Sequence, residues 1–296
     1  MRRIVIAGAH GFMGTRFADL YRADGDVVHT VGRRDADAVW GDTAAITALI
    51  DGADVLVNLA GRSVDCRYTA RNRAEILRSR VETTAELGRA VSGAGTPPPL
   101  WLNASTATIY RHAEDRPQTE EDGELGDGFS VEVATGWERA FFAAPRDGVR
   151  QVAMRTAIVL GDGSALTPMV NLARLGVGGA QAGGRQRFSW IHLDDAFRAM
   201  RFLETSDLEG PVNFSSPGPV TNAEVMAAIR TVLGVPFGIP LPRFALELGA
   251  IAIRTEAELV LKSRWMLPKR LLDAGFGFEF PELEPALRDI LHRPGG

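Results

Sequence analysis

Residues 3–14 read RIVIAGAHGFMG, and this stretch decides the fold of the chain. It opens with a short apolar run of the kind found in buried strands. Glycines then recur three residues apart, at Gly8, Gly11 and Gly14, where a helix-like segment over 13–22 begins. Such glycines allow a tight turn, a close approach of a ligand to the backbone, and close packing of helix on strand. The stretch therefore predicts a strand, a glycine-rich turn and a helix whose N-terminus can bind a diphosphate.

Strand-like and helix-like segments continue to alternate after this stretch. Strands that are apolar on both faces and separated by helices are typical of a parallel sheet with helices on both sides. We expect strands over 3–7, 27–31, 54–59, 100–103 and 151–160, and helices over 13–22, 43–50 and 70–91. The predicted fold class is α/β, a doubly wound parallel Rossmann sheet with a smaller C-terminal substrate lobe.

The composition of the sequence changes after residue 160, where glycine-rich and proline-rich stretches occur. We predict a Rossmann domain over 1–160, and we expect 161–296 to form mainly the substrate lobe and a C-terminal segment, interleaved with the first domain. Repeated glycines over 176–184 predict a flexible stretch that serves as a lid or entrance. The proline-rich stretch over 235–242 predicts a loop, and 244–262 has the pattern of an amphipathic helix.

Composition limits the partners of the chain. Its 296 residues are 45% hydrophobic and 24% charged, and the formal net charge is -4, which gives no support to nucleic-acid binding. The single cysteine, Cys66, excludes a disulfide within the chain and suits a reducing compartment. The first apolar run is too short for a signal peptide or a membrane span. We therefore expect a cytoplasmic protein with a small-molecule substrate, no nucleic-acid or membrane partner, and a homodimer as a candidate assembly.

The end of the second strand bears on cofactor choice. An NAD enzyme usually carries Asp or Glu there, whereas this chain has Arg33 and Arg34. A guanidinium pairs well with a ribose 2′-phosphate, so NADP is favoured over NAD. The alternative is that both arginines are surface charges balanced by Asp35 and Asp37. The residues that we expect to bind the cofactor are Gly8, His10, Gly11, Phe12, Met13, Gly14, Arg33, Arg34, Leu59, Ala60, Gly61 and Ile158.

Several further motifs accompany the glycine triad. They are Asn58-Leu59-Ala60-Gly61, Thr106-Ala107-Thr108-Ile109-Tyr110, Ser79-Arg80-Val81-Glu82-Thr83-Thr84, Trp137-Glu138, Arg155-Thr156-Ala157-Ile158-Val159-Leu160-Gly161, Trp190-Ile191-His192 and Leu267-Pro268-Lys269-Arg270-Leu271-Leu272. With these motifs the chain resembles the extended short-chain dehydrogenases/reductases, which include epimerases and dehydratases that use NAD(P). It is most similar to the atypical subgroup called epimerase family proteins. The resemblance covers essentially the whole chain.

The resemblance implies a Ser/Thr that orients the substrate and a Tyr-x-x-x-Lys pair that moves a proton. Thr106 matches the first position. Counting back from Glu138 along the predicted helix places Ser130 and Ala134 at the positions of the pair, and no Tyr-x-x-x-Lys occurs anywhere in the chain. Serine is far too weak an acid to replace an activated phenol, and alanine cannot hold a ribose. The usual mechanism is therefore not open to this chain.

Other side chains are candidates for the missing roles. Tyr110 could donate a proton near Thr106, or it could be a wall residue of the crevice. His192 has a suitable intrinsic pKa, but a structural role beside a helix start fits its context better. Arg80 and Arg155 could bind an anionic substrate or form internal ion pairs. No His, Cys, Asp or Glu cluster has metal-ligand spacing, so we expect no metal.

The sequence therefore leads to two hypotheses of different class. The first is an NADP(H)-dependent oxidoreductase or epimerase-like enzyme acting on a small polar substrate, with Thr106 and Tyr110 as catalytic candidates. The second is a catalytically silent NADP(H)-binding sensor, suggested by the residues at Ser130 and Ala134.

Overall fold

The computed structural model describes residues 1–246 and 262–292. Its centre is a seven-stranded parallel sheet with the order β10-β6-β5-β4-β1-β2-β3. The strands are β1 (Arg3–Ala7), β2 (Val27–Gly32), β3 (Ala38–Val39), β4 (Val55–Asn58), β5 (Leu100–Thr106), β6 (Arg150–Thr156) and β10 (Gly210–Phe214). The chain runs outward from β1 to β3 and then returns to β4 on the other side of β1. The predicted doubly wound parallel sheet is therefore confirmed, with its switch point between β1 and β4.

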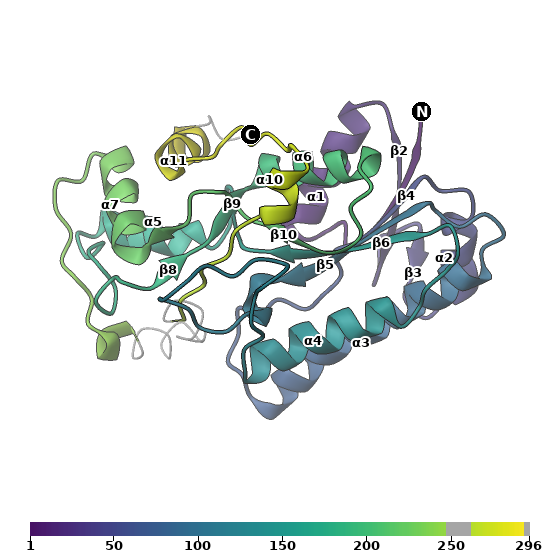
Figure 1. Cartoon of the computed structure of the whole chain (residues 1–296), viewed down its shortest axis with the longest axis horizontal. Helices are drawn as coiled ribbons and strands as arrows, with labels where there is room; N and C mark the ends of the chain where they lie inside the picture. Colours follow the sequence, from purple (N-terminus) through teal and green to yellow (C-terminus); the bar gives the residue numbers. More distant parts are fainter. Residues whose placement is uncertain (247–261, 293–296) are drawn as a thin grey trace.

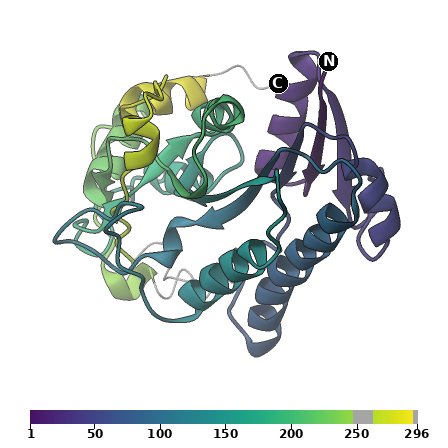
Figure 2. The same cartoon turned by 45° about the vertical axis from the view of Figure 1, so that its right-hand side comes forward.

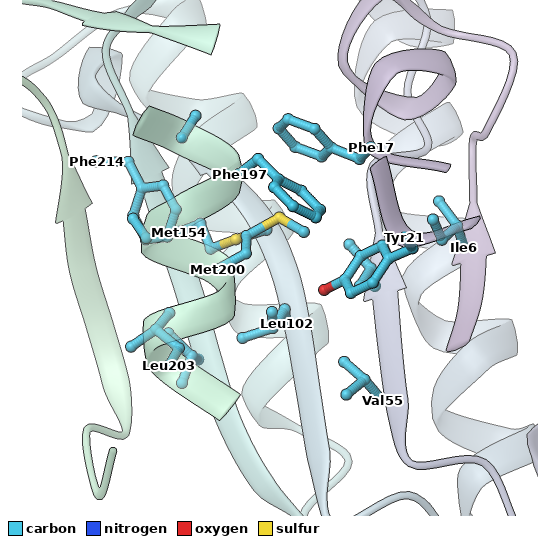
Figure 3. Packing of buried hydrophobic residues seen from close by; sticks show 14 of the residues in the cluster. Ile6, Phe17, Tyr21, Val55, Leu102, Met154, Phe197, Met200, Leu203 and Phe214 are labelled. Carbon is cyan, nitrogen blue, oxygen red and sulfur yellow. The ribbon is translucent and has the colours of Figure 1, made fainter. Parts of the chain in front are cut away.

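Helices cover both faces of this sheet (Figures 1 and 2). The helices are α1 (Phe12–Ala23) and α6 (Leu193–Thr205) on one face, and α2 (Thr43–Ile50), α3 (Ala70–Gly93) and α4 (Phe129–Phe142) on the other. Alternate side chains of β1 face opposite layers: Ile4 and Ile6 belong to the core under α1 and α6, whereas Val5 belongs to the core under the other helices. Figure 3 shows Tyr21 and Phe197 in the first of these cores.

A smaller lobe lies beyond the carboxyl end of the sheet. Its elements are β7 (Ile158–Leu160), α5 (Leu166–Arg174), β8 (Arg187–Phe188), β9 (Trp190–His192), β11 (Val220–Thr221), α7 (Asn222–Leu233) and α11 (Leu283–His292). This lobe has its own buried core, which includes Leu160, Trp190, Ile229 and Leu287. The short helix α10 (Lys269–Asp273) contacts β10 of the main sheet.

The prediction of one strand over 151–160 is wrong. The structure has two strands, because the chain leaves the central sheet after Thr156 and β7 pairs with β9 in a separate two-stranded sheet. The backbone N–H of Ala157 still donates to the carbonyl of Phe214 in β10 (2.9 Å), whereas that of Ile158 donates to the carbonyl of Ser189 (3.3 Å). The apolar run is continuous in sequence, so only the change of pairing partner marks the break.

The glycine-rich segment over 176–184 is held more firmly than its composition suggests. Four backbone hydrogen bonds join it to residues 239–241, in both directions. A Cβ on Gly179 would lie 2.5 Å from the carbonyl oxygen of Gly238, so glycine is needed here for close packing of two backbones. The structure thus pairs this segment with residues 239–241, and its flexibility and its role as a lid or entrance stay predictions.

The central sheet takes its edge strand β10 from the second half of the chain, and α6 packs on the same core. The division at residue 160 stays a prediction. The helix predicted over 244–262 lies mostly outside the described residues. Within 1–246 and 262–292, no helix combines the length and apolar character needed to cross a membrane.

Candidate functional site

The glycine turn joins β1 to α1 at the carboxyl edge of the sheet. Gly8 has a φ of +84°, and a Cβ there would lie 2.8 Å from the backbone nitrogen of Ala60. A Cβ on Gly14 would lie 2.3 Å from the carbonyl oxygen of Gly8. Gly11 is the N-cap of α1, and no side chain hydrogen-bonds at this cap. The first backbone N–H groups of α1 are therefore left for a ligand, and the turn forms a cradle that fits a diphosphate.

The end of β4 forms the second wall of this cradle, through Leu59, Ala60 and Gly61. Asn58, which is completely buried, fixes its shape: its Oδ1 accepts from the N–H of Ala60 (3.0 Å), and its Nδ2 donates to Asn103 Oδ1 (2.7 Å). Our sequence analysis did not give Asn58 this role. A polar residue that ends an apolar strand was the available signal, because a buried amide needs partners.

Arg33 and Arg34 follow β2 and are both exposed. Within the described part of the chain, neither forms a hydrogen bond or an ion pair. The carboxylate of Asp37, which could have balanced them, instead accepts from the N–H (2.7 Å) and the hydroxyl (2.8 Å) of Thr30. His10 faces the same strand end, since its Nδ1 lies 3.8 Å from the place that a Cβ on Gly32 would take. The arginines therefore remain available to a ligand.

The other predicted cofactor residues lie around the same turn. Phe12 begins α1 with its side chain 39% exposed, and its Cζ lies 3.0 Å from the place of a Cβ on Gly161. Ile158 lies just past the carboxyl end of β6 and is half-buried. A small cavity of about 10 Å³, large enough for one water molecule, is lined by Met13, Leu59 and Thr156 among others. A much larger groove of about 820 Å³ runs along α3 and α4, and none of these residues lines it.

Thr106 is the last residue of β5 and pairs in register with Thr156 of β6. It is half-buried, and its hydroxyl accepts from the N–H of Thr108 (3.2 Å). The two threonine hydroxyl oxygens are also 3.2 Å apart. Thr108, which our sequence analysis did not select, thus joins Thr106 in a pair of hydroxyls at the carboxyl edge of the sheet.

Tyr110 lies four residues later but is only 2% exposed. Its hydroxyl donates to Asn213 Oδ1 (2.9 Å) and accepts from Arg155 Nη1 (2.9 Å). Burial raises the pKa of this phenol, and a weaker acid is a poorer proton donor. The placement favours the alternative that we weighed for Tyr110, a wall residue held in a buried polar network.

The two arginines that we considered for binding an anionic substrate, Arg155 and Arg80, have different partners in the structure. Arg155 forms a buried, two-pronged ion pair with Glu138, with Nε–Oε1 and Nη2–Oε2 distances of 2.8 Å each, and Ser105 donates to the same carboxylate (2.6 Å). Glu138 therefore raises the pKa of Arg155 above its ordinary value. Arg80 bonds only to backbone carbonyls, those of Arg62 (3.0 Å) and Ile76 (3.1 Å), among the described residues.

Two further predicted positions have clear surroundings. Ala134 of α4 is completely buried, and Ser130 is half-buried one turn earlier, so this helix presents neither a phenol nor an amine where the family pair would be. His192 is buried at the start of α6, where its Nδ1 accepts from the N–H of Asp194 (3.1 Å) and its Nε2 lies 3.1 Å from Asp289 Oδ2. His192 is thus a helix cap. Among the described residues, no group of His, Cys, Asp and Glu side chains could hold a metal ion.

Comparison with known proteins adds a family to this geometry. The model of the NAD dependent epimerase/dehydratase family matches residues 4–213, and a domain of unknown function, DUF1731, matches 241–290. This chain belongs to the NAD-dependent epimerase/dehydratase family. The family resemblance that the sequence motifs indicated is therefore confirmed.

Relatives match this family member along nearly its whole length. The epimerase family protein SDR39U1 of Bos taurus is 36% identical, covering 98% of this chain and 99% of its own, and YfhF of Bacillus subtilis is 29% identical over 97% of each. A crystal structure of human SDR39U1 (isoform 2) with NADPH has a TM-score of 0.89 at 32% identity, covering 99% of this chain and 100% of that one. The two sequence relatives and the solved structure all support membership of the epimerase family proteins.

Proposed function

We propose that this family member is an NADPH-dependent enzyme that moves a hydride to or from a small polar substrate. The glycine cradle fits a diphosphate, and the human relative SDR39U1 was crystallised with NADPH. When bound, the nicotinamide supplies or accepts the hydride, which protein side chains cannot do themselves. The chain's own residues position the reactants: the N–H groups at the start of α1 bind the diphosphate, and Thr106 hydrogen-bonds the reacting oxygen.

The observation that carries this proposal is the state of Arg33 and Arg34. Both guanidinium groups are exposed beside the cradle and have no partner within the described residues. A phosphate on the ribose 2′-oxygen would give them one, through charge-assisted hydrogen bonds.

Replacing Arg33 with Asp should therefore weaken NADPH binding far more than NADH binding. The new carboxylate repels the 2′-phosphate, whereas NADH has only a hydroxyl there. We expect the dissociation constant for NADPH to rise roughly 10- to 100-fold, equivalent to about 1.4 to 2.7 kcal/mol, and that for NADH to change by less than about 3-fold. Calorimetry with both dinucleotides measures this. An equal loss for the two would contradict the assignment of Arg33 to the 2′-phosphate.

Thr106→Ala tests the catalytic half of the proposal. Loss of the hydroxyl should lower the rate of NADPH oxidation by roughly 100-fold or more and leave NADPH affinity unchanged, because we assign this hydroxyl to the reacting oxygen of the substrate and not to the dinucleotide. Single-turnover absorbance at 340 nm, with NADPH and a panel of aldehydes and ketones, measures the rate. Thr205→Ala is the matched control, since within the described residues that exposed hydroxyl bonds only to the carbonyl of Phe202 in its own helix. An unchanged rate in Thr106→Ala would remove this residue from the mechanism.

A second candidate function is a sensor of NADPH that performs no chemistry. The observation that favours it is the nature of the side chains at Ser130 and Ala134, which cannot replace a tyrosine and a lysine. Tight binding of NADPH without any oxidation across the whole carbonyl panel would support the sensor and contradict the enzyme.

A further inference from the structure

The site of this family member needs a proton donor that α4 does not supply. The chain has three tyrosines. Tyr21 is completely buried and donates to Glu204 Oε1 (2.7 Å), and Tyr110 is held by Asn213 and Arg155. The third, Tyr68, is only half-buried. Tyr68 is therefore the least buried of the three tyrosines.

The position of Tyr68 relates it directly to the missing residue. It lies between β4 and α3, in the segment that continues from the cradle wall at Gly61. Its ring packs edge to face on Phe129, with centroids 5.0 Å apart and planes at 71°. Phe129 is the first residue of α4 and immediately precedes Ser130, where the family has its tyrosine. Tyr68 thus brings a phenol from another element to the same end of α4.

Arg80 of α3 bears a similar relation to the missing lysine. Its guanidinium carbon lies 5.0 Å from the ring centroid of Trp137, which follows Ala134 by one turn of α4. The same carbon lies 3.1 Å from the place of a Cβ on Gly61, so the cation is packed against the cradle wall. Within the described residues, both hydrogen bonds of Arg80 come from Nη1. The other N–H donors of the guanidinium can therefore bind a ligand. The cation therefore lies between the cradle and the helix that lacks a lysine.

Tyr68 and Arg80 also interact electrostatically. Burial lowers the pKa of Arg80 to about 10, and a charged Tyr68 acts in the opposite direction. By reciprocity, the Arg80 cation favours the phenolate form of Tyr68. A second cation, Arg73, lies with its guanidinium carbon 4.6 Å from the centroid of the Phe129 ring on which Tyr68 packs. Both cations act to favour release of the phenol proton.

We propose that Tyr68 and Arg80 are the proton donor and the neighbouring cation of this site, supplied by the segment after β4 and by α3. This inference rests on the proposed function. In the direction of reduction, the O–H bond of Tyr68 breaks, the proton passes to the carbonyl oxygen of the substrate, and the electron pair stays on the phenolate beside Arg80. The hydride is the one that the proposed function already requires, and solvent returns the proton to Tyr68.

Titration of the tyrosines tests this pair in the free protein. With tyrosine labelled by ¹³C at Cζ, three resonances are followed by NMR against pH, and Tyr68→Phe identifies one of them. We expect Tyr68 to titrate below the ordinary value of about 10, and Arg80→Gln to move its titration upward. Arg80→Lys keeps a cation and should retain most of the lowering. Tyr21 and Tyr110 serve as internal controls, because their chemical shifts also report whether each variant is folded.

Two results would overturn the pair: a Tyr68 that titrates at or above the ordinary value, or one whose titration does not change in folded Arg80→Gln. Failure of the proposed function gives a different result. If the protein binds no NADPH, or binds it and reduces no carbonyl, the enzyme proposal fails whatever the titration shows. Where NADPH is oxidised, Tyr68→Phe should lose roughly 100-fold or more in rate, and Tyr110→Phe should lose much less.

Discussion

Gly8→Ala should raise the dissociation constant for NADPH roughly 100-fold or more, equivalent to about 2.7 kcal/mol or more of binding free energy. Gly8 has a φ of +84°, a region that costs an L-residue about 1 to 2 kcal/mol. Its new Cβ would also lie 2.8 Å from the backbone of both Leu59 and Ala60, closer than real Cβ atoms come. Because the turn at Gly8 and the backbone of Leu59 and Ala60 form the two walls of the cradle, the backbone that would bind the diphosphate must move.

Calorimetric titration with NADPH measures this loss, and far-ultraviolet circular dichroism checks that the variant is folded. Gly25→Ala is the matched control, since Gly25 has a φ of +85° and open space around the place of a Cβ. It carries the same backbone strain far from the cradle and should bind NADPH with unchanged affinity. If folded Gly8→Ala bound NADPH as tightly as the control, the cradle would not be the binding site.

Glu138→Gln should lower the free energy of unfolding by about 3 to 5 kcal/mol, the usual effect of removing one partner from a buried ion pair. Only 10% of each side chain of the Arg155–Glu138 pair is exposed, so the remaining cation cannot recover its hydration. Ser105 also loses a charged acceptor. A typical domain is stable by only about 5 to 15 kcal/mol, so the effect is a large share of the total.

Urea denaturation followed by tryptophan fluorescence gives this difference. The control is Glu284→Gln, which removes the partner of Arg288 in a pair whose side chains are 47% and 51% exposed. Such surface pairs contribute about 0 to 1 kcal/mol, so the control should remain close to the wild type. A loss in Glu138→Gln no larger than in the control would mean that other groups hold Arg155 in place.

The parts of the fold that depend on local pattern were predictable. The strand over 3–7 and the helix over 43–50 have the predicted bounds. The apolar run of the strand and the cap residues of the helix lie next to one another in the sequence, so a local pattern is enough to predict them. The break after Thr156 was not predictable in this way, because it depends on which distant strand pairs with each half of the run. The pairing of the glycine-rich segment over 176–184 was not predictable for a related reason: its partner backbone lies far along the sequence.

The candidate site divides similarly. The glycine spacing and the arginines after β2 were visible in the sequence because each motif is contiguous. The difference between Arg80 and Arg155 was not visible, since it depends on whether Glu138 reaches one guanidinium or the other in three dimensions. The contact between Tyr68 and Phe129 likewise joins two elements that no periodic pattern relates.

The edge position of β10 has a consequence for any attempt to treat the cofactor half as a module. Cutting the chain at residue 160 would strip the neighbour from β6 and leave a row of unsatisfied amides and carbonyls at a sheet border, which invites aggregation. It would also uncover the apolar surface that Phe197, Met200 and Phe214 shield (Figure 3). A transplantable nucleotide-binding unit would have to join two separate pieces of the chain, with the part of the small lobe from β7 to β9 removed from between them and the part after β10 removed from the end.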